Sequence, residues 1–168
     1  MTPEIDLLRS LVSIPSPSRF EDAACSFLER ALPSFGWDRV SRDGAGSVVA
    51  ERGKGGRELV FLCHIDTVPG GPDVRIDADV LWGRGSVDAK GPLCAAAVAG
   101  GRVELPEGWR MTLVAAVGEE DDSRGARFRL GLHRPAGCVV GEPSGTDGVT
   151  IGYRGMARVS FTAADSGA

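Results

Sequence analysis

The sequence predicts an α/β fold in which a mixed, mostly parallel sheet is flanked by helices. Three apolar runs, ELVFLC, MTLVAAVG and CVVG, are rich in strand-forming residues and show no polar alternation. Such runs are typical of strands that are buried on both faces. Segments with helical spacing precede and separate these runs along the chain. Alternation of helices with doubly buried strands indicates a parallel sheet that is covered by helices.

The composition is that of a globular protein and excludes several other classes. Of the 168 residues, 42% are hydrophobic and 25% are charged, which indicates one compact domain rather than a disordered or collagenous chain. Lys and Arg number 19 against 23 Asp and Glu, and no segment concentrates basic residues, so we expect no nucleic-acid partner. No apolar run approaches the ~18 residues of a membrane span, and the N-terminal residues lack a secretory signal pattern. We therefore expect a cytoplasmic protein without membrane contact.

The cysteines also favour a reducing compartment. They lie far apart in mostly apolar surroundings and show no C-x-x-C spacing, which is typical of buried thiols rather than of a disulfide framework. The four are Cys25, Cys63, Cys94 and Cys138.

Two helices open the chain. Thr2 stands at a possible N-cap and Pro3 at the first helical position of a short amphipathic helix over residues 2–13. Ser18 and Glu21 form an S-x-x-E pattern, which predicts a capping box at the start of a second helix. Apolar residues at helical spacing continue this second helix until a proline and a glycine end it.

Strands and further helical segments follow. WDRVSR and SVVAER flank the Gly-containing turn DGAG and predict two paired strands, and VRIDADVLWG predicts a further strand or a tight hairpin. The small residues of AKGPLCAAAVAGGRV predict a helix between ELVFLC and MTLVAAVG. SRGARFRLGLHRP is a basic segment of helix length that precedes CVVG.

A second folding unit is predicted to begin near residue 149. VTIGYRGMARVSFTA alternates as strands do and follows the turn-rich EPSGTDG, so it predicts a new antiparallel element. We therefore divide the chain into residues 1–150, the main domain, and residues 151–168, the start of a second domain.

Ionisable side chains follow each of the three buried strands. Because ligands of open α/β sheets bind beyond the carboxyl ends of the strands, these side chains are expected to share one rim. A Gly-rich loop before a predicted helix adds another carboxylate, which free backbone N–H groups can hold in place. The candidates are His64 and Asp66 after ELVFLC, Glu119 and Glu120 after MTLVAAVG, Glu142 after CVVG, and Asp88 in the loop.

This combination of side chains predicts a metal site. Several carboxylates would repel one another unless a cation lay among them, and mixed nitrogen and oxygen ligands suit zinc, with cobalt or manganese as substitutes. Asp66 lies two residues beyond His64 in an extended chain and can orient the imidazole ring. Glu119 and Glu120 diverge, so that one can bind a metal while the other serves as a base. Metal-assisted hydrolysis requires this division of roles.

Each of these motifs also has an ordinary structural explanation. A histidine after a strand is more often a loop residue than a ligand, and an E-E-D-D run is usually a solvated acidic turn. Asp88 can be a helix cap, and Glu142 can simply end a strand. The joint occurrence of such residues at successive strand ends favours the metal site.

Other catalytic patterns are missing from the sequence. It contains no nucleophile elbow, no phosphate-binding loop and no dinucleotide-binding glycine motif. Cys63 and His64 project to opposite faces of an extended segment and cannot act as a nucleophile and base pair. We expect His133 to face solvent, and Ser86 and Ser144 to be structural.

Four motifs together resemble a known enzyme family. CHIDTVPGG, GRGSVDAKGPL, VGEEDDSRGA and VVGEPSG occur in the order and spacing of the co-catalytic zinc aminoacylase and carboxypeptidase family. The resemblance implies a zinc-peptidase-like catalytic domain followed by the start of an α+β lid domain. It also implies roles for the six candidates: His64 and Glu142 would bind one Zn2+, Glu120 the other and Asp88 both, while Asp66 would orient His64 and Glu119 would be the general base.

Members of this family hydrolyse amide bonds of acylated amino acids or peptides. CHIDTVPG and GEPSGTDGVTIGYRG look most like the branch that releases lysine or ornithine from an acidic amino-group carrier protein, in lysine or arginine biosynthesis. An N-acyl-amino-acid deacylase or a dipeptidase of the same family is the first alternative. A non-catalytic module that binds a metal or the carrier is the alternative from another class.

The resemblance also bears on length and assembly. Family chains are roughly twice as long, form homodimers through the lid and carry a final histidine ligand, whereas no histidine follows His133 here. We therefore expect the 168-residue chain to correspond to the N-terminal part of such an enzyme. By itself it should hold at most one metal tightly and be inactive or nearly so.

Overall fold

A five-stranded mixed sheet forms the centre of the fold in this computed structural model, which describes residues 2–145, 147–152, 155 and 159–163. Its strands are β1 (Arg39–Arg42), β2 (Val48–Gly53), β3 (Arg57–His64), β6 (Trp109–Ala116) and β7 (Gly137–Val140). Their spatial order is β1-β2-β6-β3-β7. Strands β6, β3 and β7 run parallel, whereas β1 and β2 pair antiparallel. The prediction of a mixed sheet with a parallel core is confirmed.

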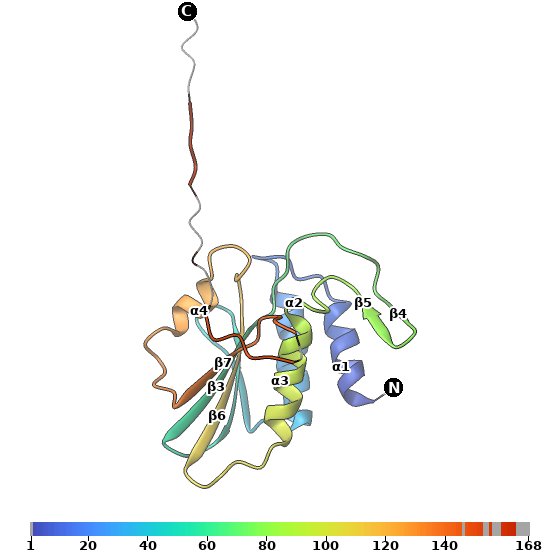
Figure 1. The fold of residues 1–168 in the computed structure, drawn as a ribbon. Coiled ribbons are helices and arrows are strands. Elements are labelled where there is room, and N and C mark those ends of the chain that lie inside the picture. The colour runs from blue at the N-terminus through green and yellow to red at the C-terminus, as the bar shows by residue number, and fades with distance from the viewer. Residues whose placement is uncertain (1, 146, 153–154, 156–158, 164–168) are drawn as a thin grey trace, which may run out of the picture.

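Helices cover both faces of the sheet. They are α1 (Pro3–Val12), α2 (Asp22–Ala31), the 3-10 helix η1 (Leu32–Phe35), α3 (Lys90–Arg102) and α4 (Arg124–Arg129). Figure 1 shows α1, α2 and α3 along one face, with α4 on the other. A separate hairpin of β4 (Arg75–Asp77) and β5 (Val80–Trp82) lies near α1. The sequence predicted a strand or a tight hairpin for this segment, and the hairpin is the form observed.

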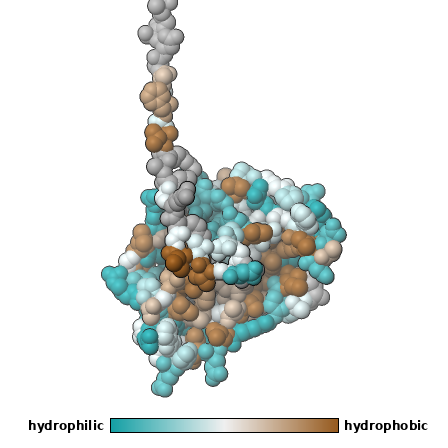
Figure 2. Space-filling model, viewed as in Figure 1, coloured by the Kyte–Doolittle hydropathy of each residue, from teal (hydrophilic) through white to brown (hydrophobic). Residues whose placement is uncertain are grey.

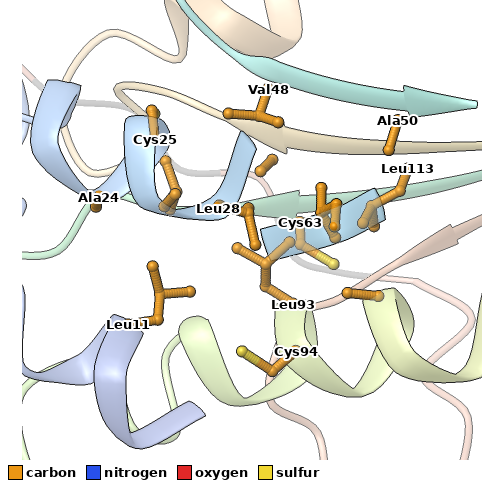
Figure 3. Packing of buried hydrophobic residues seen from close by; sticks show 14 of the residues in the cluster. Leu11, Ala24, Cys25, Leu28, Val48, Ala50, Cys63, Leu93, Cys94 and Leu113 are labelled. Atoms are coloured by element: carbon orange, nitrogen blue, oxygen red, sulfur yellow. The ribbon is translucent and has the colours of Figure 1, made fainter. Parts of the chain in front are cut away.

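The hydrophobic core lies between the sheet and helices α1, α2 and α3. In Figure 3, Leu11, Leu28 and Leu93 come from the three helices and approach Cys63 and Leu113 of the sheet. All five side chains are buried, and burial of a single leucine contributes about 1.5–3 kcal/mol. This packing fixes β3 and β6, and therefore the residues that follow their carboxyl ends.

The small residues of α3 allow it to pack closely against its neighbours. A Cβ atom at Gly101 would collide with the backbone carbonyl of Phe35, and one at Gly100 would lie 2.9 Å from Met111 Sδ. The glycines therefore bring the helix close to both η1 and β6, as is expected of a helix with few large side chains.

The predicted capping box at Ser18 and Glu21 does not form. Helix α2 begins at Asp22 with Glu21 at the N-cap and no side-chain cap hydrogen bond. Ser18 donates instead to Asp66, and Glu21 accepts two hydrogen bonds from Arg124. Both side chains therefore link this turn to distant loops, and the prediction was wrong because local spacing does not reveal such partners.

Two predicted elements differ from the structure in length. The basic segment before β7 forms a helix of only six residues, α4. The chain turns away after this helix at Gly131, whose φ of +82° is unfavourable for other residues. No strand is present among the described residues of the element predicted after residue 149, and its other residues lie outside the described part. The division of the chain at residue 150 therefore stays a prediction.

Some large hydrophobic side chains are exposed. Figure 2 shows such groups, in brown, among hydrophilic ones on one face of the molecule. Val139 and Val140 of the edge strand β7 are about half exposed, at 48% and 55%. Within the described residues, no helix is both long and apolar enough to cross a membrane.

Candidate metal centre

His64, the last residue of β3, is a buried member of the candidate site. Its side chain is 2% exposed, and its Nδ1 lies 2.9 Å from the backbone oxygen of Asp66. Because a carbonyl oxygen only accepts hydrogen bonds, Nδ1 carries a proton and Nε2 faces the other way. Nε2 lies 2.9 Å from Asp88 Oδ1. The ring is therefore held so that Nε2 can either donate to Asp88 or bind a cation.

Further carboxylates surround the same nitrogen. Glu142 Oε1 lies 3.8 Å and Glu119 Oε2 4.0 Å from His64 Nε2. Ligand atoms of His64, Asp88 and Glu120 all lie within 4.8 Å of one another. The six residues predicted from the strand ends and the loop are thus brought together. Asp66 contacts the Nδ1 side of the His64 ring, and Asp88 lies on the Nε2 side.

The charges of this cluster are unbalanced. Burial alone would lower the pKa of His64, but Asp66, Glu142 and Asp88 together raise it to about 9. The pKa values of Glu120 and Glu142 are raised, mainly by burial and also by neighbouring carboxylates. In both carboxyl groups the negative form is disfavoured, and a bound cation would relieve this. The nitrogen and oxygen donors present fit Zn2+.

Asp66 organises the site through both its backbone and its carboxylate. It is fully buried, and its carboxylate accepts the N–H groups of Glu119 at 3.0 Å and Glu120 at 3.1 Å, as well as the Ser18 hydroxyl at 2.7 Å. Burial alone would raise the pKa, but these hydrogen bonds and His64 lower it to about 2. The carboxylate is 3.6 Å from His64 Nδ1, so the ring N–H donates to the backbone oxygen of Asp66 and not to its carboxylate.

The structure excludes the ordinary explanation for Asp88. Helix α3 has Ala89 at its N-cap and no side-chain cap hydrogen bond, so Asp88 does not cap it. The Asp88 side chain is 54% exposed and reaches across to His64. A loop carboxylate that contacts a buried histidine and is open to solvent can receive a metal ion.

A hollow of about 830 Å3 adjoins the cluster. Its lining includes the ionisable side chains of His64, Glu119 and Glu142, and Leu62 and Val140 contribute apolar surface. Such a mixture of a few ionisable groups and an apolar wall is typical of a small-molecule site.

Three side chains lie in surroundings that differ from those predicted. Ser18 was assigned to a helix cap, although it binds Asp66 48 positions along the chain. His133 is not solvent-facing: its side chain is 15% exposed and its Nδ1 lies 3.0 Å from Glu58 Oε1. Cys138 is exposed, whereas the other three cysteines are buried as expected. No local signal in the sequence reveals these long-range contacts.

The fold and this cluster define a zinc-peptidase-like α/β domain. Residues 60–166 match Peptidase family M20/M25/M40. The match covers more than half of the chain, and the chain belongs to this family.

Curated relatives carry the names of hydrolases. The chain is 46% identical over 154 residues to the LysW-lysine hydrolase of Deinococcus radiodurans. This alignment covers 89% of this chain and 42% of the relative. It is 36% identical over 153 residues to the LysW-lysine/LysW-ornithine hydrolase of Sulfurisphaera tokodaii, and this alignment covers 90% of this chain and 42% of the relative. The family resemblance is confirmed, and the chain spans less than half the length of these relatives.

Solved structures share the fold. The M20 family metallo-carboxypeptidase Sso-CP2 of Sulfolobus solfataricus aligns with a TM-score of 0.68 and 19% identity, over 84% of this chain and 37% of that one. A tripeptidase of Staphylococcus aureus aligns with a TM-score of 0.64 and 22% identity, over 82% and 42%. At these identities the likeness establishes the fold.

Proposed function

We propose that this chain carries the metal centre of a dinuclear zinc amidohydrolase. The observation that carries the proposal is the set of carboxylates next to His64: Asp88, Glu119 and Glu142 lie within 4.0 Å of its Nε2. Glu120 forms a group with His64 and Asp88 whose ligand atoms all lie within 4.8 Å of one another. His64 and Glu142 would hold one ion, Glu120 the other, and Asp88 both. When bound, the two Zn2+ ions would polarise the scissile carbonyl group and make water more acidic.

Glu119 is the proton carrier in this proposal. Amide hydrolysis forms a bond from the water oxygen to the carbonyl carbon and breaks the C–N bond, so the departing nitrogen must gain a proton. Glu119 lines the hollow and is 45% exposed, while its Oε2 stays 4.0 Å from His64 Nε2. It can therefore take a proton from water and deliver it to the amine. Asp66 holds the backbone of Glu119 in place.

The proposed substrate is an amide from which lysine or ornithine is released, with a carrier protein as the acyl part. The names of the relatives from Deinococcus radiodurans and Sulfurisphaera tokodaii support this choice. The apolar wall formed by Leu62, Val139 and Val140 is suited to the aliphatic part of such a substrate. The pathway would then be lysine or arginine biosynthesis.

The test compares substrates on two proteins. One is the 168-residue chain, and the other is a chimera in which this chain replaces the aligned part of the Deinococcus radiodurans hydrolase. Both are loaded with Zn2+ or Co2+ and given lysine-loaded LysW, N-acetyl-lysine, N-acetyl-ornithine and a dipeptide. Amine release is measured before and after chelation.

We expect the chimera to release lysine from LysW only when metal is present. Preference for N-acetylated amino acids or for the dipeptide would support the proposed amidohydrolase activity but would assign it a different class of substrate. Metal binding without hydrolysis of any amide, in a folded chimera whose parent enzyme is active, would overturn the proposal in favour of a binding module.

A further inference from the structure

A buried lysine lies beneath the loop that carries Asp88. Lys90 is 1% exposed, and its Nζ donates to the carbonyl oxygens of Leu11 at 3.1 Å and Ile14 at 2.7 Å. Within the described residues, no carboxylate forms an ion pair with it. Burial of an ammonium group without a carboxylate is costly. The proposed reaction gives this side chain no chemical role, so its burial requires another explanation.

The near part of the lysine side chain supports the Asp88 loop. Gly85 has a φ of +86°, and a Cβ there would lie 3.1 Å from Lys90 Cδ and 2.9 Å from Thr67 Cγ2. The backbone N–H of Lys90 donates to the Gly85 oxygen at 2.9 Å. The loop over residues 85–90 is therefore folded against its own lysine, with Thr67 on the neighbouring side.

The far end of the side chain reaches the carboxyl end of α1. The Leu11 carbonyl belongs to the last turn of this helix, where the helix dipole favours a cation. Ile14 begins the non-helical segment of residues 14–18, which contains Ser16 and ends in a turn at Ser18. One ammonium group thus joins the end of α1 to the start of this segment.

The same segment supports the other side of the metal centre. Ser16 accepts the N–H of Thr67 at 3.0 Å and donates through its hydroxyl to the Ile65 oxygen at 2.8 Å. Ser18 donates to Asp66 at 2.7 Å. The segment that Lys90 holds is therefore the one that fixes the residues immediately after β3.

We propose that Lys90 is a positioning residue for the metal centre, because it ties the Asp88 loop and the segment of residues 14–18 to one anchor at the end of α1. This inference rests on the proposed metal centre. Loss of the two carbonyl contacts would let the Asp88 carboxylate move relative to His64, and both ion sites share Asp88.

The test uses Co2+ alone as the probe and needs no turnover. Lys90→Met keeps the length of the side chain and removes its charge and donors. Arg52→Met is the matched control, since Arg52 donates to the carbonyls of Gly100 and Val103 at the end of α3, a similar contact away from the rim. Affinity, the visible Co2+ spectrum and the melting temperature are measured for each chain.

We expect Lys90→Met to bind Co2+ about 10-fold to 100-fold more weakly, as is usual when a group that orients metal ligands is lost, and with an altered spectrum. Arg52→Met should keep wild-type affinity and spectrum, although both variants melt earlier. Lys90→Arg should recover part of the affinity, because it restores cationic donors.

Wild-type affinity and spectrum in folded Lys90→Met would overturn the inference and leave the metal centre intact. If that variant does not fold, Lys90→Gln takes its place, because its uncharged side chain is one atom shorter and loses the contacts at 3.1 Å and 2.7 Å to Leu11 and Ile14. Wild-type Co2+ binding in folded Lys90→Gln would overturn the inference equally. Failure of the wild-type chain to bind Co2+ would overturn the proposed metal centre, and this inference with it.

Discussion

His64 Nε2 lies 2.9 Å from Asp88 Oδ1, although the two residues are 24 positions apart in the chain. This contact joins the end of β3 to the loop before α3. Asp88 also belongs to one group with His64 and Glu120, whose ligand atoms all lie within 4.8 Å of one another, and the proposal therefore assigns it to both ion sites.

Replacement of Asp88 by Ala should therefore disturb both proposed ion sites, whereas His64→Ala should weaken mainly one. Calorimetric titration with Zn2+ gives the stoichiometry and affinity of each variant. Asp73→Ala, which removes an exposed loop carboxylate away from the cluster, is the control and should bind as the wild type does. Unchanged stoichiometry and affinity in Asp88→Ala would remove its assignment as the shared ligand.

Metal binding should release protons and strengthen as the pH rises. His64 has a pKa raised to about 9 in the metal-free protein, so it is mostly protonated at pH 7 and must lose that proton to bind a cation. The raised pKa values of Glu120 and Glu142 act in the same direction. Apparent affinity should increase from about pH 6 to about pH 9 and then level off.

Calorimetry in buffers of different ionisation enthalpy measures the protons released on Zn2+ binding. His64→Ala should release fewer protons than the wild type. Equal affinity for Zn2+ across this pH range would show that His64 does not have to lose a proton, and would argue against it as a ligand.

Glu119→Gln should separate metal binding from turnover. The amide keeps the size of the side chain and loses the basic oxygen, so Zn2+ affinity should change little while amide hydrolysis by the chimera falls by roughly 100-fold to 10,000-fold. Glu120→Gln is the matched neighbour and should lose metal affinity instead. Near-normal hydrolysis by Glu119→Gln would assign the proton transfer to another group.

Ser18→Ala should loosen the support behind the metal centre. The variant loses the 2.7 Å hydrogen bond to the buried Asp66 carboxylate, and hydrogen bonds to charged groups contribute about 1.5–3 kcal/mol. Urea unfolding should show a loss of this order, together with reduced hydrolysis by the chimera. Ser34→Ala, which removes an exposed hydroxyl bond to Ala31, should affect both far less. Equal effects of the two variants would argue against a special role for Ser18.

The strand ends were the predictable part of the site. The apolar runs identified β3, β6 and β7, and the rule that ligands bind beyond the carboxyl ends of strands placed His64, Glu119 and Glu142 at one rim. The alternation of strand side chains also predicted that Asp66 would accompany His64. These inferences use only local periodicity and the order of elements, which a sequence states directly.

The supporting contacts were not predictable in this way. Ser18 meets Asp66, and Lys90 meets Ile14, across 48 and 76 positions of the chain. Ser18 satisfied a local capping pattern, but the buried carboxylate of Asp66 offered it a charged acceptor, and the tertiary contact was formed instead. Which of several possible hydrogen bonds forms depends on the packed structure and not on spacing.

Glu58 should make the stability of the fold depend on pH in the acid range. It lies near the opposite end of β3 from His64 and is 2% exposed. Its carboxylate accepts from Thr112 Oγ1 at 2.8 Å, from His133 Nδ1 at 3.0 Å and from Arg110 at 3.1 Å. Burial opposes ionisation, but these hydrogen bonds outweigh it, and the pKa of Glu58 is lowered.

A lowered pKa in the folded state means that the unfolded chain binds a proton first as the pH falls. The stabilisation from Glu58 is therefore fully present above its ordinary pKa of about 4.5 and is lost as the pH falls through the lower folded value.

In Glu58→Gln the amide cannot accept all three hydrogen bonds, so the variant should be less stable than the wild type at pH 7 by about 1–3 kcal/mol. The difference should shrink as the pH falls below about 4.5, because the unfolded wild-type chain then binds a proton that the folded carboxylate does not yet take up. Urea unfolding of the metal-free chain at several pH values measures this, with Glu51→Gln, which removes an exposed pair with Arg39, as the control. A difference between Glu58→Gln and the wild type that stays constant from pH 7 down to the acid limit of folding would mean that the three hydrogen bonds do not depend on the charge of Glu58.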